Sequence, residues 1–212
     1  MITALGERAL RVQLGEEIAP TVNDRVLALA DALQRAALPG VLGWAPAYAV
    51  LTIHYDPLRL GYDALRTWVE QTLPQVQQPE PLAGRQVCIP VRYGGAAGPD
   101  LDFVARHTGL SHQAVIDRHT AAVYRVYMLG FLPGFAYLGG LDPALHTPRL
   151  ETPRLHVPAG SVGIAGAQTG VYPCPSPGGW QLIGQTELCL FDPNAQPPCL
   201  LAPGDQVRFV AV

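Results

Sequence analysis

The sequence predicts an α+β protein of two units, a small mixed unit at the N-terminus and a larger strand-rich unit after it. Apolar residues recur at helical spacing in the first third of the chain. Short β-rich segments separated by Gly and Pro fill the later part, and a polar, proline-rich stretch separates the two patterns. The chain has 212 residues, of which 49% are hydrophobic, so it can bury two small cores.

Residues 1–73 are predicted to form the small unit, in the order strand, helix, strand, strand, helix. The first helix is indicated by apolar residues at helical spacing and by Pro20 in its first turn, where proline is favoured. The five elements are expected at residues 9–14, 20–37, 41–44, 48–55 and 62–73. This order suggests a ferredoxin-like split βαβ arrangement.

Residues 74–84, PQVQQPEPLAG, show neither helical nor strand periodicity and are predicted to be a linker. The second domain is then residues 85–212. Two short helices are expected early in it, at 100–107 and 112–121, the second capped by Ser111. Its strands are expected at 86–93, 123–129, 181–184, 187–191 and 207–212. Many short strands with Gly and Pro turns predict a barrel or a sandwich.

Composition excludes several functions. The net charge is −3 and no run of Arg occurs, which argues against nucleic-acid binding. No apolar run approaches the roughly 20 residues of a membrane span, and the N-terminus lacks a signal pattern, so we expect a cytoplasmic protein. All 14 basic residues are Arg. Without lysine, the chain has no P-loop lysine, no Schiff-base lysine and no site for lysyl biotinylation.

The most informative segment is residues 130–180. It holds 10 Gly and 8 Pro in 51 residues, but its only formally charged side chains are Asp142, Arg149, Glu151 and Arg154. Disordered chain of this kind is normally poor in bulky apolar residues, whereas this segment is rich in aromatic and branched ones. We therefore expect an ordered run of tight turns that presents backbone amides and a few polar groups, as binding and catalytic sites do.

The same segment carries a family resemblance. The motifs GFLPGFAYLGGL, PRLETPRLHVPAGSVGIAGAQTGVYP, SPGGWQLIG, LFDP and LLAPGDQVRF resemble the KipI / allophanate hydrolase subunit 1 family, which includes the B subunits of bacterial 5-oxoprolinases. Weaker similarity covers PAYAVLTIHYDP and YGGAAGPDLDFVARHTGLS. The resemblance implies that the second domain is a cyclophilin-like β-barrel.

The resemblance also implies a function, that of one component of an ATP-dependent 5-oxoprolinase that opens 5-oxo-L-proline to L-glutamate. The implied partners are a second related 5-oxoprolinase subunit, of the C type, and a lactam-utilisation subunit, of the A type. ATP would be bound by or shared with a partner. Two other activities in the family stay open, namely inhibition of a sensor histidine kinase, as by KipI, and association with an allophanate hydrolase or urea carboxylase.

Two arginines are the first candidate substrate-binding residues. Arg149 and Arg154 lie five residues apart in a nearly uncharged block, and guanidinium groups bind carboxylates and phosphates at two points. A 5-oxoproline carboxylate or an acyl phosphate would suit them. The alternative is a salt bridge, for instance with Glu151.

The remaining candidates lie between residues 156 and 176. The resemblance favours Gln168 as catalytic and Thr169 and Ser161 as substrate-binding; a Gly-bent barrel strand is the alternative. His156 is a candidate general base, although structural histidines are more common. Tyr172 and Ser176 are candidate substrate-binding groups, and no G-x-S-x-G elbow supports Ser176 as a nucleophile. No His and Cys spacing predicts a metal site.

The sequence departs from the family pattern at four positions. Gln185 and Glu187 stand where the family pattern has Arg and Pro, Ala96 stands where it has Glu after YGG, and Trp44 stands where an acidic residue is common before PAY. If the missing Arg or Glu belonged to a shared site, altered substrate choice or weaker activity would follow.

Overall fold

The computed structural model describes residues 1–77 and 84–212, and the chain divides into two compact units, Met1–Ala83 and Gly84–Val212. Most of the predicted linker lies at residues 78–83, outside the described residues. Its first residues belong to the 3₁₀-helix η1 (Leu73–Val76), where Val76 is buried. Among the described residues, no helix combines the length and the apolar composition that a membrane span requires.

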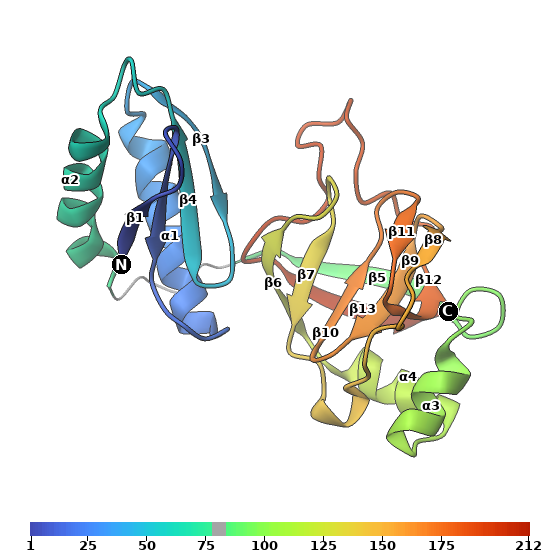
Figure 1. Ribbon diagram of the computed structural model, residues 1–212. Helices are drawn as coiled ribbons and strands as arrows, with labels where there is room; N and C mark the ends of the chain where they lie inside the picture. The colour runs from blue at the N-terminus through green and yellow to red at the C-terminus, as the bar shows by residue number, and fades with distance from the viewer. Residues whose placement is uncertain (78–83) are drawn as a thin grey trace. The chain divides into compact units, whose positions relative to one another are not determined.

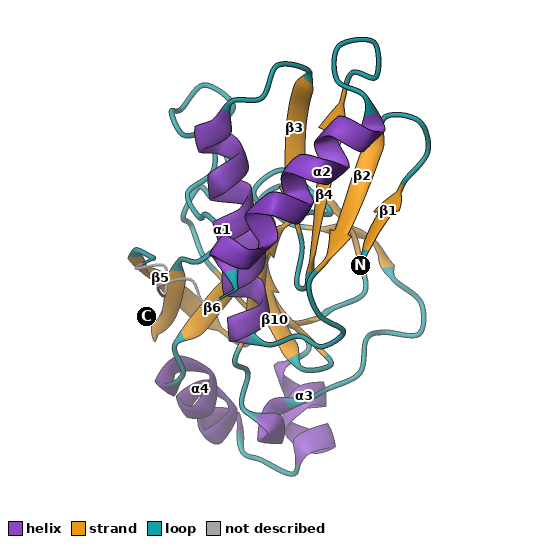
Figure 2. Cartoon of the chain, turned by 90° about the vertical axis from the view of Figure 1, so that its left-hand side faces the viewer, coloured by secondary structure: helices purple, strands orange, loops and turns teal. Residues whose placement is uncertain are grey.

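The first unit is a four-stranded antiparallel sheet covered on one face by two helices (Figure 2). The sheet order is β1-β2-β4-β3. The strands are β1 (Ile2–Ala4), β2 (Ala9–Gln13), β3 (Val41–Pro46) and β4 (Val50–Tyr55), and the helices are α1 (Pro20–Ala36) and α2 (Tyr62–Thr72).

Alternation along the two central strands places the core of this unit on one face of the sheet. Leu10 of β2 pairs with Ile53 of β4, and Val12 pairs with Leu51, all fully buried. Leu29, Leu33, Leu65 and Val69 of the helices complete the core. Strand β1, which was not predicted, pairs with β2 at the sheet edge. The ferredoxin-like assignment stays a prediction.

The second unit contains a closed β-barrel of seven strands (Figure 1). The order around the barrel is β10-β7-β6-β13-β5-β12-β9, and β9 pairs with β10 to close it. The strands are β5 (Gln86–Tyr93), β6 (Tyr124–Leu129), β7 (Ala136–Gly139), β9 (Ser161–Ala165), β10 (Gln168–Val171), β12 (Gln181–Gln185) and β13 (Gln206–Ala211). This architecture agrees with the barrel predicted for the second domain.

Two helices, a short 3₁₀-helix (η2, Pro143–Leu145) and a two-stranded sheet accompany the barrel. Helices α3 (Leu101–Thr108) and α4 (His112–Ala121) lie together at one end of the barrel (Figure 1). Strands β8 (Arg154–Val157) and β11 (Ser176–Gly178) form a separate two-stranded sheet. The strand predicted at 187–191 is wrong, because this segment is irregular apart from one bridge between Phe191 and Cys199.

The barrel's first and last strands, β5 and β13, pair in parallel, and a buried acid fixes this junction. Asp205 accepts hydrogen bonds from the backbone N–H groups of Arg85 (3.0 Å) and Ala202 (2.9 Å), and its carboxylate pairs with the Arg85 guanidinium at 2.7 Å. A Cβ atom at Gly84 would lie 1.9 Å from the carbonyl oxygen of Gly204, so the backbone contact at this junction requires glycine.

One buried histidine ties α4 to the barrel interior. The His119 ring stacks on Phe209 at 4.5 Å, its Nδ1 lies 2.8 Å from the Tyr93 hydroxyl, and its Nε2 lies 2.9 Å from the Thr169 hydroxyl. Thr169 donates its single hydroxyl proton to the carbonyl of Gly163. Thr169 must therefore accept from Nε2–H, and Tyr93 must donate to Nδ1. Burial lowers the pKa of His119 to about 3, so the ring is neutral at neutral pH.

An ion pair joins α3, β8 and β12. Arg154 Nη2 lies 2.6 Å from Asp100 Oδ1, while Asp100 Oδ2 accepts the backbone N–H of Leu182 at 2.6 Å. Arg154 also donates to the carbonyl of Trp180. Because the Asp100 side chain is only 12% exposed, its charge depends on these donors rather than on water.

The neutral His119 predicts an acid-labile fold. The pKa of His119 is about 6.5 in the unfolded chain and about 3 in the folded protein. Between these pH values only the unfolded chain binds the proton, so the free energy of unfolding decreases as the pH falls from 6.5 to 3. We expect the free energy of unfolding of the unaltered protein to fall by about 1.4 kcal/mol more per pH unit than that of His119→Gln. Urea unfolding at several pH values measures both slopes, and exposed His54→Gln is the control. Equal slopes for the unaltered protein and His119→Gln would contradict the assignment.

Removing the Arg154 charge should destabilise the second unit. Arg154→Gln leaves the Asp100 carboxylate without its cation, and we expect a loss of about 2–3 kcal/mol in the free energy of unfolding. Arg118→Gln is the matched control, because it breaks the more exposed Arg118–Asp142 pair and should cost less than about 1 kcal/mol. Similar losses in both variants, measured by urea unfolding, would show that the Asp100 pair has no special role.

Candidate functional site

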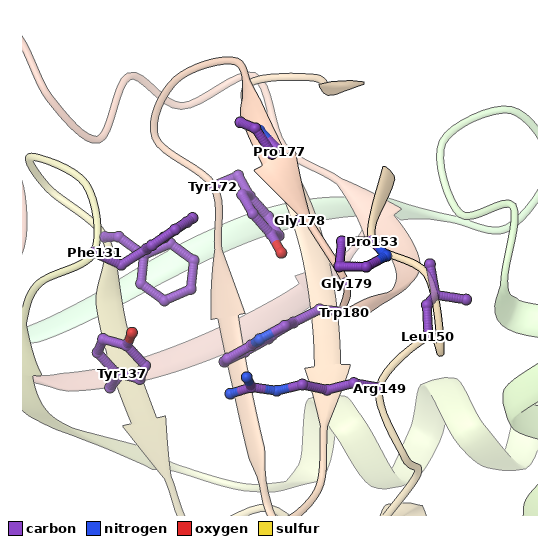
Figure 3. Close-up of a pocket in the computed structure, with 11 residues that line it drawn as sticks. Phe131, Tyr137, Arg149, Leu150, Pro153, Tyr172, Pro177, Gly178, Gly179 and Trp180 are labelled. Atoms are coloured by element: carbon purple, nitrogen blue, oxygen red, sulfur yellow. The ribbon is translucent and has the colours of Figure 1, made fainter. Parts of the chain in front are cut away.

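A pocket of about 290 Å³ opens on the second unit, where the segment 130–180 contributes every lining residue (Figure 3). Its walls come from the turn between β6 and β7, from β7, from the segment before β8, and from the segment between β10 and β12. The lining residues are Phe131, Phe135, Tyr137, Arg149, Leu150, Pro153, Tyr172, Pro177, Gly178, Gly179 and Trp180.

Edge-to-face aromatic contacts fix the pocket walls. The buried Phe135 ring lies 5.1 Å from Tyr137, 5.3 Å from Tyr172 and 5.4 Å from Trp180, with interplanar angles between 66° and 88°. This is the favoured geometry for aromatic pairs and adds to the stabilisation from burial alone. Phe135 therefore acts as the common support of the pocket's other rings.

The turn at the pocket mouth is strained. Phe131 has a φ of +68°, and the N–H of Leu132 donates to the carbonyl of Gly130 at 2.8 Å, which defines a three-residue γ-turn. A bulky residue rarely adopts positive φ, and such strain concentrates at ligand sites. Phe131 nevertheless stays 61% exposed, edge-on to Phe135 at 5.6 Å.

Arg149 and Tyr172 are two of the polar side chains that line this largely apolar space. The Arg149 guanidinium lies 5.9 Å from the centre of the Trp180 ring, within cation–π range. Tyr172 is buried, and a Cβ atom at Gly178 would lie 2.4 Å from its hydroxyl, so glycine leaves the space that the phenol occupies. Burial raises the pKa of Tyr172, although the Trp180 backbone N–H, Arg149 and Arg154 act in the opposite direction.

The structure brings some predicted site residues together and separates others. Arg149 and Tyr172 line the pocket. Arg154 binds Asp100 and the Trp180 carbonyl beneath it, instead of the Glu151 considered from sequence. Ser176 is buried on β11 and donates to the carbonyl of Pro177.

The other four predicted residues do not line the pocket. Thr169 is buried in the barrel against His119, and Ser161 is buried on β9. Gln168 begins β10 and is half-buried, and His156 is exposed on β8. Their assigned roles stay predictions.

Sequence reasoning missed much of the pocket wall. None of Phe131, Phe135, Tyr137 and Trp180 is among the residues predicted from sequence to bind substrate. The available signal was their spacing around Pro133 and Gly134, which marks a tight turn with aromatic rings on both sides.

Three of the departures from the family pattern lie elsewhere in the unit. Ala96 and Gln185 line a second, more open pocket beside Tyr93 and Arg92. Glu187 pairs with Arg92 at 2.9 Å, with both side chains well exposed. Ala96 and Gln185, where the family pattern has charged residues, therefore line the same pocket. Arg92, which also lines it, is already paired with Glu187.

We tested whether the described residues fit a metal or ATP. Among them, no three His, Cys, Asp or Glu side chains are grouped closely enough to hold a metal ion. Gly163 and Gly170 lie in the antiparallel strands β9 and β10, joined at Gly166, whereas a phosphate-binding loop opens a helix. With no lysine in the sequence, this glycine-rich hairpin does not fit the phosphates of ATP.

Comparison with known proteins finds relatives that match nearly the whole chain. The B subunit of the 5-oxoprolinase of Bacillus subtilis is 45% identical over 221 residues, covering 100% of this chain and 92% of that protein. The protein of the same name from Escherichia coli O157:H7 is 48% identical over 210 residues, covering 97% and 93%. The crystal structure of TTHA0988 superposes with a TM-score of 0.86 at 46% identity, covering 97% of this chain and 40% of that chain.

These relatives confirm the resemblance noted in the sequence. The family described as "Carboxyltransferase domain, subdomain C and D" matches residues 1–201. The chain belongs to this family, and its curated full-length relatives are named as the B subunits of 5-oxoprolinases.

Proposed function

We propose that this chain is one subunit of a cytoplasmic, ATP-dependent 5-oxoprolinase, which converts 5-oxo-L-proline and water to L-glutamate. The observation that carries the proposal is the 45% identity to a 5-oxoprolinase B subunit over the whole chain. The lactam amide is resonance-stabilised, so coupling its hydrolysis to that of ATP supplies the driving force.

The pocket suits one part of such a reaction. Its walls are largely aromatic and apolar, and Arg149 supplies a positive charge for an anionic substrate. The lining contains neither a carboxylate nor a histidine, so this chain offers no general base there. The catalytic base is therefore proposed to come from a partner protein, and the chain alone should be inactive.

We assign ATP binding to a partner protein. Bound ATP would supply the phosphoryl group that activates the lactam, and the glycine-rich hairpin of this chain does not fit its phosphates. The proposed partners are a second related 5-oxoprolinase subunit, of the C type, and a lactam-utilisation subunit, of the A type.

The finer fold assignments belong to the same proposal. The order β1-β2-β4-β3, with α1 connecting β2 to the non-adjacent β3, supports a ferredoxin-like first unit in which β1 occupies one sheet edge. The closed barrel with two peripheral helices supports a cyclophilin-like second unit.

A second candidate function is association with a urea carboxylase. The description of the matching family as a carboxyltransferase domain favours it. A biotin-carrying partner would then be required, because this chain has no lysine to carry biotin.

The test is 5-oxoproline-dependent ATP hydrolysis together with glutamate release, by the chain alone and by the chain co-purified with its partner subunits. We expect both activities from the complete mixture and neither when any one component is omitted. Urea with a biotinylated partner serves as the alternative substrate. A stable, correctly assembled complex that hydrolyses no ATP in response to 5-oxoproline would overturn the proposal.

A further inference from the structure

Within the described residues, Arg149 is a cation that forms no ion pair with an acidic side chain. Its guanidinium lies over the Trp180 ring. Arg154, five residues later, is by contrast fully engaged by Asp100. An exposed arginine at the rim of an apolar pocket is suited to bind a carboxylate through two parallel hydrogen bonds.

Tyr172 is the second polar group available to a ligand. The side chain is 1% exposed and lines the pocket, and no acceptor for its phenolic proton is found among the described residues. In Figure 3 its hydroxyl points toward Gly178, which belongs to the same lining. A buried phenol that stays protonated is a hydrogen-bond donor, and a buried donor favours a ligand that supplies an acceptor.

The rest of the lining is flat and uncharged. Trp180, Phe135 and Tyr137 supply ring surfaces, and Pro153 and Gly179 supply the opposite side. The volume of about 290 Å³ suits a small ring compound. The lining contains no Asp or Glu, so it offers no carboxylate to pair with a buried ammonium group.

We propose that this pocket binds the cyclic lactam substrate, with Arg149 holding the carboxylate and Tyr172 donating to the ring carbonyl. The inference rests on the proposed function. It explains selectivity by charge: a lactam nitrogen is neutral, whereas proline and glutamate carry an ammonium group. The ring-opened product, with its new ammonium and second carboxylate, fits the pocket less well, which favours its release.

The test pairs each residue with the ligand group it is assigned to. Calorimetric titration of the full chain uses 5-oxoproline, 2-pyrrolidinone, which lacks the carboxylate, and L-proline, which lacks the ring carbonyl. We expect Arg149→Gln to weaken 5-oxoproline binding about 10-fold to 100-fold and to leave 2-pyrrolidinone binding unchanged. Tyr172→Phe keeps the ring and should weaken both lactams about 5-fold to 10-fold. Arg208→Gln, an exposed arginine on β13 outside the pocket, is the control.

The outcomes separate this inference from the proposed function. Equal effects of Arg149→Gln and Arg208→Gln, or equal affinity of the unaltered chain for 5-oxoproline and 2-pyrrolidinone, would overturn the inference. If the isolated chain binds no ligand, the same variants are assayed in the assembled complex, where Arg149→Gln should raise the KM for 5-oxoproline at least about 10-fold. An unchanged KM in an active complex overturns the pocket assignment alone. Lactam binding through Arg149 without any turnover by the complex overturns only the proposed function.

Discussion

The pocket depends on the carboxylate of Asp100. Through one oxygen it holds Arg154 at the start of β8, and through the other it holds the backbone of Leu182 on β12. Trp180 lies two residues before that bond, and Arg154 also binds its carbonyl. Because this carboxylate is largely buried and hydrogen-bonded on both oxygens, it fixes an irregular segment to the regular barrel. This carboxylate and the contact with Phe135 together position the indole wall.

The two arginines of the segment 149–154 differ in their partners, which is why only Arg149 is proposed to bind substrate. Arg154 has a structural role, since its charge neutralises the largely buried Asp100 carboxylate. Arg149 stays available, stacked on an aromatic face instead of paired with an acid. Arg149 is the one charged residue in the pocket lining, so under the proposal a ligand carboxylate would have no other charged side chain of the lining to pair with. The strained turn at Phe131 adds a hydrophobic edge at the mouth.

The regular elements could be predicted because their patterns are local. The α1 range was predicted to within one residue, and those of β5 and α4 without error, from periodicity, Pro20 and Ser111. Strands β8 to β11 were missed because Gly and Pro interrupt any alternation. The strand predicted at 187–191 was wrong, since only Leu190 is buried there and the segment is irregular apart from the bridge at Phe191. The partner of Arg154 lies 54 residues away, and His119 lies in a helix, so neither contact has a local signature.

The most direct test of the pocket as the lactam site is an NMR titration of the three tryptophan indole N–H signals with 5-oxoproline. Trp180 lines the pocket, while Trp44 and Trp68 pack on the core of the first unit and serve as internal controls. We expect a saturable shift of the Trp180 signal alone, since ring currents and charge change only in the pocket. Movement of the Trp44 or Trp68 signal with Trp180 unchanged, at saturating 5-oxoproline, would contradict the account.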